Sequence, residues 1–264
     1  MAEVNPTLVA GSDQNLNSFF VQLRNSLDEH YDRRERIIKC SRDITALSKK
    51  MIFSLHRITQ RPMHAVFKEA EERKKEIIKK FEEVSVELGG GNYYRYLRSI
   101  SPAIQEYIEA LAFWEYLKND RLISKEEVEK TLVNSEGQQL LAITDEDYVL
   151  GVADLSGELM RYAINCVGKG DHDTTLKIRH FLREMKGEYD LITVTARSGL
   201  GKKLDAMKAS LNKVEDACYS IRIRGSEYPK EMFLFVVNQL NARNEEREEE
   251  GGGLLVAASH LALM

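Results

Sequence analysis

The chain has 264 residues, of which 43% are apolar and 30% are charged, and it contains only four prolines. This is the composition of a helix-rich globular protein with one large domain or two small ones. The formal net charge of −4 argues against a free-standing nucleic-acid binder, which usually carries a basic surplus. A nucleic-acid role would therefore need local basic patches or the charge of a partner.

The compartment signals indicate an intracellular protein. Cys40, Cys166 and Cys218 lie far apart and show neither a CxxC spacing nor a disulfide framework, so we expect reduced thiols. The N-terminus lacks the basic and long apolar regions of a signal peptide, and no run of about 18 apolar residues could span a membrane. We expect no membrane partner and a location in the cytoplasm and the nucleus.

The first part of the chain predicts two long helices. Residues 1–13 read as a disordered lead, whereas apolar side chains recur at helical spacing over residues 14–60 without Gly or Pro. This pattern predicts one very long helix, or two in line, that breaks just before Pro62. A second helix is expected over residues 63–88, because the triple glycine at 89–91 is a strong stop signal.

The second part predicts shorter helices. A helix over residues 92–119 contains Pro102, where we expect a kink or a break. Ser124 followed by Glu127 is a capping box that opens a short helix. The segment "YDLITVTARSGLG" is the only β-like stretch, and we expect a loop there because one strand cannot build a sheet. Further helices are expected over residues 145–167, 176–186 and 202–224.

These patterns predict an all-α fold. We expect a bundle of about seven mostly antiparallel helices with a long N-terminal helix, spanning residues 14–240. Residues 241–264 form an acidic and Gly-rich tail, which we expect to be partly disordered or an expression remnant.

Two acids interrupt an otherwise apolar helix in "LGVADLSGELMR", residues 150–161. Asp154 and Glu158 lie one helical turn apart on the same face, and like charges at that spacing destabilise a helix by a few tenths of a kcal/mol. Gly157 between them costs about another 1 kcal/mol relative to Ala. A structural helix has no reason to accumulate these costs, whereas a divalent cation would remove the repulsion.

A second acid pair lies in "QEYIEALAFWEYL", where Glu106 and Glu109 are three residues apart among apolar and aromatic neighbours. Two antiparallel helices that each offer two carboxylates could converge on one point. Oxygen donors suit Mg²⁺, with Mn²⁺ as an alternative, rather than zinc. The ferritin-like alternative requires Glu-x-x-His, which neither pair has. The competing interpretation is that each pair decorates a solvated helix face, which is common for such spacings.

Basic residues accompany the acids. Arg95 and Arg98 precede Glu106 on roughly the same side of their helix, and Arg161 follows Glu158 at i+3. Such residues could hold RNA phosphates near a metal, or they could pair with the acids or face water. The six histidines show no ligand spacing, and we interpret them as surface or capping residues.

Four longer segments resemble a known family, the translin family, and "GVADLSGELMR" favours its factor X branch over translin itself. The segments are "YDRRERIIKCSRDITALSKKMIFSLHRI", "QEYIEALAFWEYLKNDRLIS", "DYVLGVADLSGELMRYAINCVGKGD" and "SLNKVEDACYSIRIRGSEYPKEM". The resemblance covers residues 15–240 and implies a fold of about seven helices, assembly with translin into a hollow, octamer-like hetero-oligomer, and enclosure of single-stranded RNA, with single-stranded DNA as a further ligand.

The resemblance also implies an activity, a Mg²⁺-dependent endoribonuclease that removes passenger-strand fragments and so promotes activation of the RNA-induced silencing complex. The acidic catalytic and metal-binding residues of the family match Glu106, Glu109, Asp154 and Glu158, the four acids that the spacing singles out. Glu109 and Glu158 are expected to be the most direct ligands. The alternative hypothesis is a non-catalytic, nucleic-acid-binding or architectural subunit whose acids pair with arginines.

Overall fold

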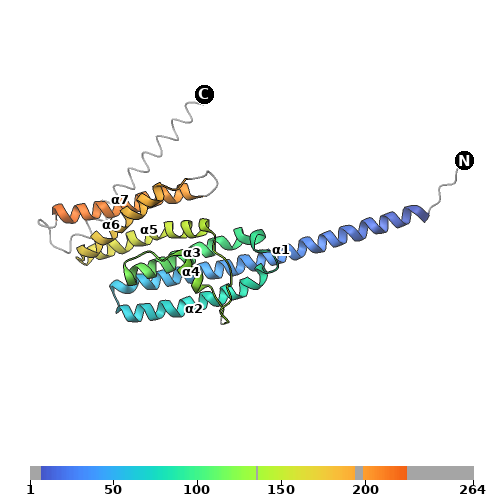
Figure 1. The fold of residues 1–264 in the computed structure, drawn as a ribbon, viewed down its shortest axis with the longest axis horizontal. Helices are drawn as coiled ribbons and strands as arrows, with labels where there is room; N and C mark the ends of the chain where they lie inside the picture. Colours follow the sequence, from blue (N-terminus) through green and yellow to red (C-terminus); the bar gives the residue numbers. More distant parts are fainter. Residues whose placement is uncertain (1–6, 135, 194–198, 225–264) are drawn as a thin grey trace, which may run out of the picture.

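The computed structural model describes residues 7–134, 136–193 and 199–224, and this part of the chain is helical and contains no strand (Figure 1). The all-α prediction is therefore confirmed. The elements are α1 (Thr7–His56), η1 (Arg57–Thr59), α2 (Met63–Leu88), α3 (Tyr93–Asn119), α4 (Lys125–Thr131), α5 (Asp145–Gly168), α6 (His172–Asp190) and α7 (Leu200–Arg224).

Helix α1 is a single helix of 50 residues, and its N-terminal half projects beyond the bundle (Figure 1). It begins at Thr7, within the lead that the sequence predicts to be disordered, while residues 1–6 and the predicted tail at 241–264 lie outside the described residues. The helix ends in the single 3-10 turn η1 before Pro62, where the sequence predicts the break. The projecting half exposes a set of large apolar side chains, namely Leu16, Phe19, Phe20, Leu23, Leu27 and Tyr31.

Helices that follow one another in the chain run antiparallel, but the helices that carry the acids do not. On α3 and α5, Ser101 contacts Asp147 and Gln105 lies against Gly151, so the register rises in the same direction on both helices. The antiparallel arrangement predicted for these two helices is therefore wrong. The physical reason is that α4 and its flanking loops carry the chain back to the end of the bundle where α3 begins.

Helix α1 is also parallel to α3. His30 contacts Tyr96 near one end of the shared length, and the ring of His56 lies 4.7 Å from that of Phe113 near the other. Three roughly parallel helices, α1, α3 and α5, thus lie side by side, with α2 on one side and α6 and α7 on the other (Figure 1).

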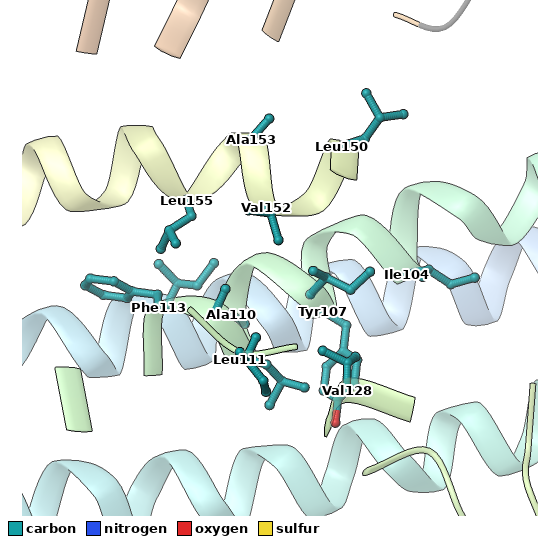
Figure 2. Close-up of a cluster of buried hydrophobic side chains, with 14 of the residues drawn as sticks. Ile104, Tyr107, Ala110, Leu111, Phe113, Val128, Leu150, Val152, Ala153 and Leu155 are labelled. Atoms are coloured by element: carbon teal, nitrogen blue, oxygen red, sulfur yellow. The ribbon is translucent and has the colours of Figure 1, made fainter. Parts of the chain in front are cut away.

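The core forms mainly between α3 and its neighbours (Figure 2). Tyr107 is fully buried and its hydroxyl contacts that of Thr131 at 2.8 Å, which ties α4 to α3. At Gly151 an added Cβ would lie 2.8 Å from the carbonyl oxygen of Gln105, so α5 approaches α3 at a distance that only glycine permits.

Pro102 lies inside α3, and the helix continues through it instead of breaking. The proline ring is exposed, while Ile100, Ala103 and Ile104 on both sides are fully buried. Packing of both halves against the same neighbours offsets the loss of one helical hydrogen bond. The capping box predicted at Ser124 and Glu127 is confirmed, since each residue's side chain bonds the other's backbone N–H.

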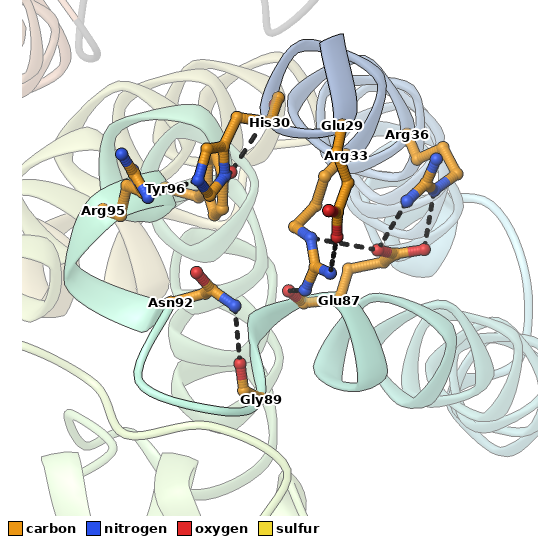
Figure 3. A network of polar contacts seen from close by, with 9 residues as sticks. All are labelled: Glu29, His30, Arg33, Arg36, Glu87, Gly89, Asn92, Arg95 and Tyr96. Carbon is orange, nitrogen blue, oxygen red and sulfur yellow. Dashed lines mark hydrogen bonds and ion pairs between the residues drawn. The ribbon is translucent and has the colours of Figure 1, made fainter. Parts of the chain in front are cut away.

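A polar network fixes the end of the bundle from which α1 projects (Figure 3). Arg36 forms two hydrogen bonds with Glu87 of α2, at 2.7 and 3.0 Å. His30 contacts the Tyr96 hydroxyl at 2.6 Å through Nδ1 and the Arg95 guanidinium at 2.7 Å through Nε2. These contacts set the register of α1 against α2 and α3. The three cysteines are free, and none of the described helices is both long and apolar enough to cross a membrane.

Candidate active site

A pocket of about 570 Å³ opens between α1, α3 and α5, beyond the core described above. All four acids predicted from the sequence line it, two from α3 and two from α5. The complete lining is Lys49, Ile52, Phe53, His56, Glu106, Glu109, Asp154, Glu158 and Arg161. We call it the acid pocket. The structure therefore brings the two pairs together, although on parallel rather than antiparallel helices.

Glu109 is the most isolated of the four acids. Its side chain lines the pocket, the residue is only 8% exposed, and no hydrogen bond or ion pair reaches the carboxyl from the described part of the chain. Burial raises its pKa to about 8, and the negative charges of Asp154, Glu158 and Glu106 add to the effect. Glu109 is therefore largely protonated at neutral pH.

Each of the other three acids has a cationic partner. Glu106 pairs with Lys49 at 3.2 Å, but its second oxygen, Oε2, is buried without a hydrogen-bond partner. Glu158 contacts His56 Nε2 at 2.5 Å through one oxygen and Arg161 at 3.0 Å through the other. These contacts lower the repulsion that four neighbouring carboxyl groups would otherwise create.

Asp154 is held from outside the pocket by Lys203 of α7. The Lys203 ammonium donates to Asp154 Oδ2 at 2.6 Å, to Gln105 Oε1 at 3.1 Å and to the backbone carbonyl of Leu150 at 3.0 Å. One side chain thus links α7 to both helices that carry the acids. Nothing in the local sequence around Lys203 marks this role, because the contact joins segments about fifty residues apart.

His56 corrects the interpretation of the histidines as surface or capping residues. Its side chain is 17% exposed and contacts Glu158, and it makes no capping hydrogen bond although it is the residue before η1. The other ring nitrogen, Nδ1, is buried without a hydrogen-bond partner. A lone histidine at the end of a helix gives no spacing signal, so only the fold reveals its place in the pocket.

The donor chemistry of the acid pocket fits a hard divalent cation. It offers carboxylate oxygens from two helices, and both Glu109 and one oxygen of Glu106 lack protein partners among the described residues. However, the described residues contain no group of three His, Cys, Asp or Glu side chains already arranged to hold a metal ion. Since cations occupy the other carboxylates, metal binding would require these acids to exchange partners.

The predicted basic residues divide between two places. Arg161 lines the acid pocket, whereas Arg95 and Arg98 line a second hollow of about 680 Å³ between α1 and α3. Arg34, Arg42 and Lys49 of α1 lie in the same hollow, which we call the basic groove. Lys49 lines both the groove and the pocket, so the two are continuous.

A parallel-helix bundle with a pocket of four acids beside a basic groove is an arrangement found here within one recognisable family. The chain belongs to the translin family, whose sequence pattern matches residues 32–225. Within that family it is 40% identical to Translin-associated protein X of Mus musculus over 250 residues, which covers 86% of each chain. It is 27% identical to Translin of Homo sapiens over 218 residues, 80% of this chain and 94% of that protein.

Solved structures have the same fold. Apo-NeC3PO matches with a TM-score of 0.58 at 24% identity, covering 81% of this chain and 97% of that chain. A complex of AfC3PO with duplex RNA matches with a TM-score of 0.61 at 22% identity, covering 79% of this chain and 99% of that chain. At these identities the likeness concerns the fold alone.

Proposed function

We propose that the chain is the catalytic subunit of a metal-dependent endoribonuclease that cleaves single-stranded RNA in complex with a translin partner. The observation that carries this proposal is the convergence of Glu106, Glu109, Asp154 and Glu158 on one pocket, with Glu109 buried and unpaired among the described residues. A buried carboxyl without a partner is costly in a purely structural protein. The likeness to Translin-associated protein X supports the partner.

In this proposal Glu109 and Glu158 hold the ion most directly, and Glu106 and Asp154 complete its surroundings. When bound, Mg²⁺ would supply polarisation of the scissile phosphate and a lowered pKa of an attacking water. Glu109 gives up its proton to act as a ligand. Lys49 and Arg161 stand at the rim with side chains 64% and 65% exposed, where they can attract the phosphates that flank the cleaved bond.

The test uses the complex with its translin partner. Single-stranded RNA should be cut with Mg²⁺, not with EDTA, and not by Glu109→Gln or Glu158→Gln, while the variants still assemble and bind RNA. The products should carry 5′-phosphates. Glu72→Gln, an exposed acid on α2, is the control and should cleave normally. Normal cleavage by the Glu158→Gln complex would show that the acids have another role.

The second candidate is a non-catalytic, architectural or nucleic-acid-binding subunit. One observation favours it, since cations already hold three of the acids and no ready ligand group of three occurs among the described residues. The two candidates differ in metal dependence. In the architectural case EDTA would leave assembly and RNA binding unchanged, and no RNA cleavage would depend on Glu158.

We further propose the setting in which the activity serves. Within an octamer-like particle formed with translin, in the cytoplasm and the nucleus, the subunit would remove passenger-strand fragments and promote activation of the RNA-induced silencing complex. The support for this setting is the family resemblance together with the exposed apolar half of α1, which offers a large surface for assembly. Cleavage of a nicked passenger strand by the purified complex, and its loss in Glu158→Gln, would test it.

A further inference from the structure

An exposed phenylalanine stands at the rim of the acid pocket. Phe53 is 71% exposed, yet it lines the pocket together with the four acids. On α1 it lies one turn from Lys49 and from His56, which line the same pocket. Its ring contacts no other aromatic ring in the described part of the chain, so packing does not explain its presence.

The basic groove leads directly to this point. Arg34, Arg42 and Arg98 line the groove, are exposed, and form no ion pair with any of the described residues. Arginines without counter-ions are notable in a chain of net charge −4. Because α1 rises by about 1.5 Å per residue, the stretch from Arg34 to Lys49 is roughly 22 Å long.

We propose that a single RNA strand lies along the basic groove and that Phe53 stacks on a base next to the phosphate held over the acids. This inference rests on the proposed function. Guanidinium groups suit the phosphodiester backbone, and an exposed aromatic face suits an unstacked base of any identity. A base within a duplex is already stacked and paired, so Phe53 favours flexible single strands.

A contact with another protein chain is the competing explanation for an exposed phenylalanine. The geometry favours RNA, because a protein segment that covered Phe53 would also close the pocket that contains Glu109 and Glu158. The continuity of this pocket with the basic groove through Lys49 likewise matches an extended anionic strand better than an apolar protein surface.

The test is a double-mutant cycle between the protein and the RNA. The complex with its translin partner is measured in EDTA, where binding does not depend on cleavage. Its affinity for an eight-nucleotide single strand is compared with that for an abasic ribose-phosphate oligomer of the same length. Phe53→Ala should weaken binding of the base-bearing strand by about tenfold, as loss of one base–aromatic stack does, and should not affect the abasic oligomer.

Two variants make the result specific. Phe53→Trp preserves an aromatic face and should retain wild-type affinity for the base-bearing strand. Phe20→Ala removes another phenylalanine of α1, 60% exposed and far from the pocket, and should leave both affinities unchanged. Because Phe53 is exposed, its truncation leaves the core intact.

The groove is tested by its salt dependence. Removing Arg34 and Arg42 together should weaken both oligomers equally and reduce the slope of log affinity against log salt by about 1.4, which is about 0.7 for each lost phosphate contact on a single strand. Lys75→Ala with Lys79→Ala, two exposed lysines of α2, is the matched control and should leave the slope unchanged.

Three results would overturn the inference: equal effects of Phe53→Ala on both oligomers, loss of translin co-purification in Phe53→Ala, or an unchanged salt slope in the groove variant. The outcome is separable from that of the proposed function. If Glu158→Gln still cleaves RNA, the catalytic proposal fails, while base-specific coupling to Phe53 would still establish the strand path.

Discussion

Replacing Glu109 by glutamine should remove a large pH dependence of stability. The folded-state pKa of this group is raised from 4.5 to about 8 by burial and by the neighbouring acids. A raised carboxyl pKa means that the folded chain holds a proton that the unfolded chain releases. The stabilising contribution of the neutral carboxyl is therefore complete below about pH 4.5, is lost progressively as pH rises, and is exhausted near pH 8.

The magnitude follows from one proton. Within this window wild-type stability should fall by roughly 1.4 kcal/mol per pH unit relative to the glutamine variant. Between pH 6 and 7.5 the difference grows by about 2 kcal/mol, which corresponds to a shift in Tm of roughly 4–8 °C for a chain of this size. No discount for solvent screening applies, because Glu109 is only 8% exposed.

The assay is thermal unfolding in EDTA at several pH values, followed by circular dichroism. The Tm of Glu109→Gln should exceed that of the wild type by a margin that widens with pH, whereas Glu72→Gln should follow the wild type throughout. A constant difference between pH 6 and 7.5 would refute the reasoning, because it would mean that Glu109 keeps one protonation state across that range.

Further substitutions test the packing around the site. Gly151→Ala places a Cβ at 2.8 Å from a backbone carbonyl of α3 and should cost about 1–3 kcal/mol of stability by thermal unfolding, with reduced RNA cleavage. Gly157→Ala, whose Cβ would meet nothing within 4 Å, should instead stabilise the chain by up to about 1 kcal/mol. Lys203→Met leaves Asp154 without its ion pair and should cost about 1–3 kcal/mol, measured by urea unfolding. Ser124→Ala should cost about 1 kcal/mol in the same assay through loss of the cap of α4.

Most helix boundaries could be predicted because their signals are local. Pro62 and the triple glycine at 89–91 bound α2 at the predicted residues, Met63 and Leu88. The start of α6 was predicted four residues late, at 176 instead of His172. The missed signal is Asp171, whose side chain accepts a hydrogen bond from the backbone N–H of Thr174 and so caps the helix.

The acid pairs could be predicted for the same reason, since spacings of three and four residues place Glu106 with Glu109, and Asp154 with Glu158, on one helix face. Their meeting in one pocket depends on the relative direction of α3 and α5, which no local pattern determines. The partners His56 and Lys203 come from α1 and α7 and have no spacing signal.

The glycine argument also divides along this line. Conformational cost singled out Gly157 in the sequence, but its surroundings are open and packing does not require it. The glycine that packing does require is Gly151, where α5 touches the backbone of α3. Sequence alone gives the cost of a glycine in a helix, whereas its necessity depends on which residues lie opposite.

The arrangement of charges suggests how metal and RNA binding are linked. In the structure Lys49 and Arg161 neutralise Glu106 and Glu158. If these acids turn to a bound cation, the two basic side chains are released at the rim, where phosphates arrive. Metal and RNA should then bind with positive coupling, typically of fivefold or more in affinity. Mg²⁺ acting only as a counter-ion would compete for phosphates and weaken RNA binding. The sign of the effect of Mg²⁺ on the Kd of a cleavage-resistant phosphorothioate strand therefore distinguishes the two, and replacing Lys49 and Arg161 by alanine should abolish any tightening.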